Sequence, residues 1–150
     1  WAEDAYRRQD KRFFNKTTHG IGEWLRFRVF GNGYGKCNRF VAAAYREGAG
    51  LDFPKMKDGN DPIVEELANA SNYQEKLDYF RDPARLQPGD IVIWYDPNQE
   101  VHHTAIVVAI EDQTPIVTYA GAGEQIKRVP LDHATLKLKN VTPVFRRWRE

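Results

Sequence analysis

Apolar residues in the first half of the chain recur at the spacing of helices. Four of them would form one apolar face on a helix from Asn38 to Glu47, namely Phe40, Val41, Ala44 and Tyr45. Gly48 and Gly50 follow this run and are expected to end the helix. A proline and a capping box are typical of helix starts. These signals predict helices from Asp61-Pro62 onward and from Ser71 to about Phe80. A helix is also expected over residues 2–14.

The second half of the chain changes to short runs of β-branched and aromatic residues that turn residues separate, which is typical of strands. The five predicted strands cover residues 91–95, 102–110, 116–120, 125–129 and 141–145. Helices followed by strands indicate an α+β fold with a mostly antiparallel sheet. We expect a single domain over residues 1–150, with residues 1–20 as a helical N-terminal extension.

Composition narrows the classes of protein to consider. The chain has 150 residues, 41% of them hydrophobic and 13% aromatic, which favours a folded domain. Its net charge of +1 requires no nucleic acid or other polyanion as partner. No apolar run reaches membrane-spanning length. We expect a monomer, processed or cut from a longer chain because it begins at Trp1 rather than methionine.

The only cysteine, Cys37, follows a loop that contains Gly31, Gly33 and Gly35, and it lies at the predicted start of the helix. A single cysteine excludes an internal disulfide and a zinc site built from several thiolates. Unpaired amides at a helix start favour negative charge, and such positions lower the pKa of a thiol below its free value of about 8.5. Cys37 is therefore a candidate nucleophile; the alternative is a small buried apolar residue without chemistry.

A thiol nucleophile needs a base, and the chain has four histidines. His102 and His103 begin a predicted strand, whereas His19 and His133 are expected in loops. Adjacent strand residues point to opposite faces, so only one of His102 and His103 can face the cysteine helix. The same geometry makes the two a poor metal site, and we expect neither a metal nor another cofactor. Either histidine could instead be a surface or core residue.

Three sequence blocks carry a family resemblance: residues 37–41 (Cys-Asn-Arg-Phe-Val), residues 86–92 (Leu-Gln-Pro-Gly-Asp-Ile-Val) and residues 103–107 (His-Thr-Ala-Ile-Val). Their order and spacing resemble the signature blocks of the NlpC/P60 and CHAP cell-wall peptidases, over residues 22 to 130. The resemblance implies a papain-like fold with the helical N-terminal half packed on the sheet. It also implies hydrolysis of peptidoglycan, either within the stem peptide or at the amide that joins stem to sugar.

The resemblance further implies site residues. Cys37 would be the nucleophile and His103 the base, and the backbone amide of Cys37 would help to form the oxyanion hole. Trp24 and Tyr34 lie where the family often has an aromatic residue beside the thiol. The family's third polar residue, which orients the histidine, is replaced here by Tyr119 or Thr118, depending on the alignment. A backbone carbonyl could serve instead.

Two other functions stay open. The same arrangement serves acyltransferases and glutamine deamidases, including toxins that act on proteins, and a binding module could keep the fold without catalysis. A compact hydrolase of this kind suits a secreted antibacterial toxin delivered to the periplasm or cell wall, or a phage lysin. For a toxin, we expect the producer to make an inhibitor protein that blocks the cleft.

Overall fold

The computed structural model describes residues 1–3, 36–120 and 126–149, and the predicted helix over residues 2–14 falls almost entirely outside them. The helices of the described part are α3 (Lys36–Ala43), which continues as a π-helical turn over Ala44–Gly48, α4 (Val64–Ala68) and α5 (Leu131–Lys137). The strands are β1 (Leu77–Phe80), β2 (Ile91–Asp96), β3 (Val101–Glu111), β4 (Thr114–Ala120), β5 (Ile126–Pro130) and β6 (Val144–Trp148).

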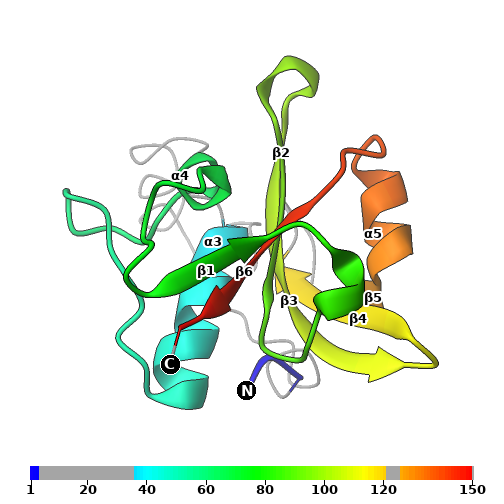
Figure 1. Cartoon of the computed structure of the whole chain (residues 1–150), viewed down its shortest axis with the longest axis horizontal. Coiled ribbons are helices and arrows are strands. Elements are labelled where there is room, and N and C mark those ends of the chain that lie inside the picture. Colours follow the sequence, from blue (N-terminus) through cyan, green and yellow to red (C-terminus); the bar gives the residue numbers. More distant parts are fainter. Residues whose placement is uncertain (4–35, 121–125, 150) are drawn as a thin grey trace, which may run out of the picture.

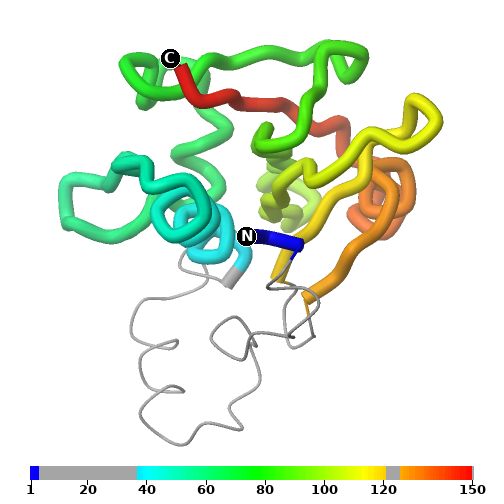
Figure 2. Tube along the Cα trace, turned by 90° about the horizontal axis from the view of Figure 1, so that it is seen from below, coloured from blue at the N-terminus to red at the C-terminus, as the bar shows by residue number. Residues whose placement is uncertain are grey.

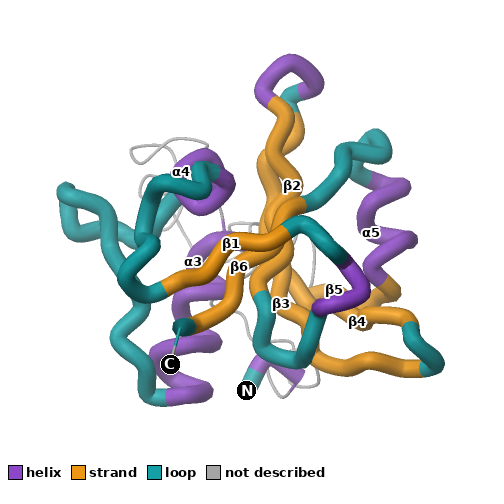
Figure 3. Tube along the Cα trace, in the orientation of Figure 1, coloured by secondary structure: helices purple, strands orange, loops and turns teal. Residues whose placement is uncertain are grey.

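The strands form one sheet in the order β1-β6-β2-β3-β4-β5, and every neighbouring pair in it is antiparallel. Figure 3 shows β2 and β3 as the long hairpin at the centre of the sheet. Their register places His103 opposite Trp94 and Thr104 opposite Ile93. Residues that face each other in this way share one face of the sheet, so this register decides which side chains surround the candidate histidine.

Helices cover the two faces of the sheet, with α3 and α4 on one side of the central hairpin and α5 on the other (Figures 1 and 2). The α3-side core includes Cys37 and Val41 of α3, Leu67 of α4, and the isoleucines of two central strands, Ile91, Ile93 and Ile106. The α5-side core includes the alternate residues of β2 and β3, namely Val92, Trp94, Ala105 and Val107, together with Tyr119 of β4, Leu131 of α5 and Phe145 of β6. The period-2 alternation of β2 and β3 thus separates two buried layers.

The α+β class and the mostly antiparallel sheet are confirmed. The predicted helix over residues 38–47 corresponds to α3 and its π-helical turn, and Gly50 adopts a φ of +66° just beyond its end. Four predicted strands correspond to β2–β5, although residue 125 lies outside the described part. The last strand, β6, begins at Val144 rather than Val141.

The predicted helix from Ser71 to Phe80 is wrong. Residues 71–76 form turns, Tyr73 has a left-handed φ of 59°, and residues 77–80 form β1. Leu77 and Phe80 are both buried, and β1 pairs with β6, nearly 70 residues further along the chain. Pairing with a distant strand therefore overrode the local capping signal. The helix α5 was not predicted from the sequence. It contains His133, which was expected in a loop.

No helix of the described residues is both long enough and apolar enough to cross a membrane.

Candidate active site

Cys37 is the second residue of α3 and is buried, with an exposed fraction of 9%. It packs in the α3-side core with Ile106 of β3. The backbone amide of Thr104 also lies close enough to the Cys37 sulfur to favour its thiolate. Because Thr104 directly follows His103, the structure places the thiol beside the same stretch of β3 that carries the candidate base.

Burial dominates the ionisation of this thiol and raises the pKa of Cys37 to about 11. The backbone amides of Thr104, Asn38 and Cys37 itself act in the opposite direction, as expected at a helix start, but their effect is smaller. The lowered pKa that the sequence predicted is therefore not found, because loss of hydration penalises the thiolate more than nearby amides stabilise it. At neutral pH the thiol is protonated in this arrangement.

His103 lies on β3, half-buried, with its ring between two aromatic side chains. The Tyr119 ring meets it edge-on, with centroids 4.5 Å apart, and the Trp94 ring lies tilted at 5.8 Å. The Nε2 atom of His103 is buried and has no hydrogen-bond partner in the described part of the chain. Burial, with a smaller contribution from His102, lowers the pKa of His103 to about 4, so the imidazole is neutral at pH 7.

Strand alternation separates the two histidines as the sequence predicted. His103 shares its face with Ala105 in the α5-side core, whereas Thr104 and Ile106 share the α3 side. The exposed His102 falls on the same side as Thr104. Cys37 and the His103 ring therefore contact different layers of side chains around one segment of β3, and the His103 Nε2 makes no hydrogen bond to the thiol.

The two candidates for the third position also lie on opposite faces. Tyr119 is buried on the His103 side and contacts its ring. Thr118 pairs with Ile106 and is fully buried, and none of the described residues is a hydrogen-bond partner of its Oγ1. Of the two, only Tyr119 thus lies against the histidine. Trp24 and Tyr34 lie outside the described residues.

Sequence reasoning missed three features of the site. Trp94 stacks beside His103, which the pairing of β2 with β3 would have indicated had the register been known. The Thr104 amide beside the sulfur is a backbone group with no sequence signal. Asn38, next to Cys37, donates its Nδ2 to the Pro62 carbonyl at 3.0 Å, and its buried Oδ1 has no partner among residues 1–3, 36–120 and 126–149.

No group of three or more histidine, cysteine, aspartate or glutamate side chains that could hold a metal ion occurs among residues 1–3, 36–120 and 126–149.

The fold and the site define an α+β domain in which a helix opening with a lone cysteine packs on an antiparallel sheet, beside a strand that carries a histidine. The model of one family, the CHAP domain, matches residues 28–122, which is more than half of the chain and includes the whole of α3 and β3. The chain belongs to the CHAP domain family. No curated protein and no solved structure gives a significant match to it. Membership of this family indicates a cell-wall hydrolase or amidase with peptidoglycan as its substrate.

The thiol pKa can be tested by alkylation, because Cys37 is the only cysteine. We expect iodoacetamide to modify the folded protein slowly at neutral pH, and the rate to keep rising at about pH 10, where the rate of a free thiol has levelled off. Intact-protein mass spectrometry over a pH series measures this, with a cysteine-containing peptide as control. Rapid modification at about pH 6 would contradict the high pKa and reveal a thiolate–imidazolium pair.

His103 should make the fold sensitive to acid. Its pKa is about 4 in the folded protein and 6.5 without the fold, so between these values the unfolded chain binds the extra proton. The neutral imidazole thus contributes stability that is fully present above pH 6.5 and is lost as the pH falls through 4. We expect the Tm to fall across this window and His103→Gln to flatten the decline. His102→Gln, at an exposed position, should not flatten it.

Proposed function

We propose that the chain hydrolyses an amide bond of the peptidoglycan stem peptide, with Cys37 as nucleophile and His103 as general base. The observation that carries the proposal is the CHAP family match together with a thiol at the start of α3 that lies against the amide of Thr104, the residue after His103. The buried Nε2 of His103, which has no hydrogen-bond partner among the described residues, is compatible with the assignment, because it is free to accept a proton.

The proposed reaction starts from two neutral groups. In this proposal substrate binding brings the His103 ring, which otherwise contacts Trp94 and Tyr119 of the α5-side layer, to the Cys37 thiol. His103 takes the thiol proton as the sulfur attacks the substrate's carbonyl carbon, and a carbon–sulfur bond forms. The backbone amide of Cys37 donates to the oxygen on which negative charge develops. The imidazolium returns the proton to the leaving nitrogen as the carbon–nitrogen bond breaks. Water then hydrolyses the thioester with His103 again as base, which releases the carboxylate and restores the thiol.

Tyr119 is the proposed positioning residue. A base that must accept a proton on one ring nitrogen works best when the ring is held in one orientation. The edge-on contact of the Tyr119 ring at 4.5 Å limits how the His103 ring can turn. In this proposal Tyr119 acts through packing and its hydroxyl rather than through a carboxylate.

A second candidate is a binding module that kept the fold and lost catalysis. The high pKa of Cys37 and the location of the His103 ring in the α5-side layer favour it, because neither group is ionised or bonded to the other. Such a module would bind peptidoglycan and release no product. Acyl transfer or glutamine deamidation would instead give a transferred acyl group or ammonia from a protein.

The proposed setting follows from the substrate. A peptidoglycan hydrolase acts in the periplasm or cell wall after secretion or delivery. Disulfides form in such oxidising compartments, and Cys37 cannot form one within this sequence because it is the single cysteine. If the protein acts as an antibacterial toxin, a cognate inhibitor protein should bind over Cys37.

Replacing the nucleophile tests the proposal. Purified peptidoglycan is incubated with the protein and with Cys37→Ala, and the products are identified by mass spectrometry. We expect the wild type to release muropeptides with a new amine and carboxylate, and the variant to release none, because no other thiol can attack the carbonyl. The Tm should change by only a few degrees, since a small side chain is lost. Turnover by the folded variant would refute the mechanism, and binding by the wild type without product would establish the module instead.

The choice of base is tested by a matched pair of variants. His103→Ala should lower kcat by about 10³-fold or more, as expected for the loss of a catalytic base, whereas His102→Ala should stay within about tenfold. Rates are compared at a pH near 7, where both variants remain folded. The opposite ranking would assign the base to His102, on the α3 side of the sheet.

Substitutions at the two hydroxyl residues of β4 test the positioning role. Tyr119→Phe should lower kcat less than loss of the base does, because the ring that limits the histidine remains. Thr118→Val should leave kcat nearly unchanged, since Thr118 lies on the α3-side face of the sheet and does not contact the His103 ring. Circular dichroism and Tm serve as controls for folding. Equal effects of both substitutions would remove Tyr119 from the site.

A further inference from the structure

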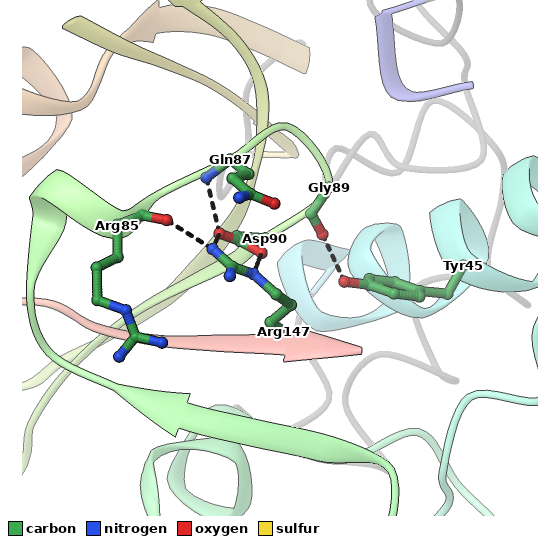
Figure 4. Close-up of polar contacts among 6 residues, drawn as sticks. All are labelled: Tyr45, Arg85, Gln87, Gly89, Asp90 and Arg147. Atoms are coloured by element: carbon green, nitrogen blue, oxygen red, sulfur yellow. Dashed lines mark hydrogen bonds and ion pairs between the residues drawn. The ribbon is translucent and has the colours of Figure 1, made fainter. Parts of the chain in front are cut away.

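Tyr45 connects the far end of the cysteine helix to a turn 44 residues away. Its hydroxyl donates a hydrogen bond to the Gly89 carbonyl, as Figure 4 shows. Tyr45 is buried in the π-helical turn that continues α3, and its ring packs against Phe53 and Trp148, with centroids 5.1 and 5.9 Å away. Burial, and then the nearby Asp90 carboxylate, raise the pKa of Tyr45, so the hydroxyl remains a donor at any physiological pH.

The turn that accepts this bond, Pro88-Gly89-Asp90, is fixed on β3. The Gly89 amide donates to the Val107 carbonyl at 2.7 Å, and the Val107 amide donates to the Asp90 carbonyl at 2.9 Å. Gly89 has a φ of +98°, a conformation that a side chain would strain. The hydroxyl of Tyr45 is therefore bonded to a turn whose own position is set by Val107.

An ion pair between the buried Asp90 and the partly exposed Arg147 holds the same turn from the side of β6. Asp90 is only 2% exposed, and Arg147 donates to its two carboxylate oxygens at 2.8 and 2.7 Å (Figure 4). The Gln87 amide donates to the carboxylate at 2.8 Å, and Arg147 also donates to the Arg85 carbonyl at 2.6 Å. Such bidentate, charge-assisted contacts are strong and directional. The turn thus has little freedom to move relative to the sheet.

The cysteine helix therefore meets β3 at two points. Near its start, the Cys37 sulfur lies against the Thr104 amide, and near its end Tyr45 reaches Val107 through Gly89. Eight residues of helix span about 12 Å. Three residues of strand span about 10 Å. The two spans match closely enough for the helix to be held along the strand at both ends.

We propose that Tyr45, together with the Pro88-Gly89-Asp90 turn and Arg147, is a positioning network that sets the place of Cys37 along β3. This inference rests on the proposed function of Cys37, and it gives a role to the second of the three signature blocks, which provides no reacting atom. Without the Tyr45 hydroxyl, the end of the helix keeps its packing on Phe53 and Trp148 but loses its hydrogen bond to the turn. The helix can then shift along β3, which exposes the thiol and moves it from the position that the reaction requires.

Two tyrosine-to-phenylalanine variants test the network. Tyr45→Phe removes the bond to Gly89 and keeps the ring packed between Phe53 and Trp148, so the variant should fold. The matched control is Tyr73→Phe, which also loses one hydroxyl bond, the 3.1 Å contact to Glu66, whose two partners are not members of the network. For each protein we would measure the Tm, the rate of Cys37 alkylation by iodoacetamide at about pH 8, and kcat and KM on peptidoglycan fragments.

In Tyr45→Phe, iodoacetamide should alkylate Cys37 at least about fivefold faster than in the wild type. The kcat should fall about tenfold with little change in KM, since a misplaced nucleophile affects the chemical step rather than binding. Tyr73→Phe should alter neither value, even if its Tm falls as far. Asp90→Asn weakens the ion pair with Arg147 and should therefore also increase the rate of Cys37 alkylation. Unchanged alkylation in Tyr45→Phe alongside a lowered Tm would make the contact merely structural and overturn the proposal. Because alkylation requires no turnover, it judges the network even if the wild type hydrolyses nothing.

Discussion

The packing of α3 against β3 is the contact on which the rest of the structure depends. It buries Cys37 and Val41 against Ile106 and completes the α3-side core. Burial of this apolar surface stabilises the fold, and it brings the only thiol to the central hairpin of the sheet. The same burial removes water from the sulfur and opposes its ionisation. Stability and reactivity therefore pull in opposite directions at Cys37.

That conflict shapes the chemistry available to the site. A preformed thiolate–imidazolium pair would need both groups to carry charge in a dry environment, where charge separation is costly unless the partners bond directly. Here the thiol and the imidazole are both neutral, and their surroundings favour neutrality. A neutral pair can still react if the base takes the proton during the attack, when substrate and backbone amides compensate the developing charge. Substrate binding would thus be part of the activation.

Local patterns in the sequence were enough for the elements that such patterns determine. The apolar spacing from Phe40 to Tyr45 predicted the cysteine helix, and β-branched runs predicted β2 to β5. The strand β1 could not be found in this way, because its partner β6 lies far along the chain and the capping signal at Ser71, just before β1, favoured a helix.

The site was predictable as residue types but not as geometry. The sequence indicated Cys37 and a histidine at the start of β3, and alternation showed that only one of the two histidines could face α3. Which side each takes depends on the register with β2, and the pKa of Cys37 depends on its burial, neither of which a sequence pattern contains. Tyr45 looked like one more apolar position of a helix, since its hydroxyl finds Gly89 only once the chain has folded.

The two buried layers that the sheet separates have a consequence for how this domain can change. Side chains of the α3-side and α5-side cores do not interdigitate, because the backbone of β2 and β3 lies between them. Changes of volume in one layer should therefore combine additively with changes in the other. A lineage could remodel the layer around α5 while leaving the surroundings of Cys37 nearly untouched. His103 is the exception. Its ring packs in the α5-side layer, while the next residue, Thr104, lies against Cys37 in the α3-side layer.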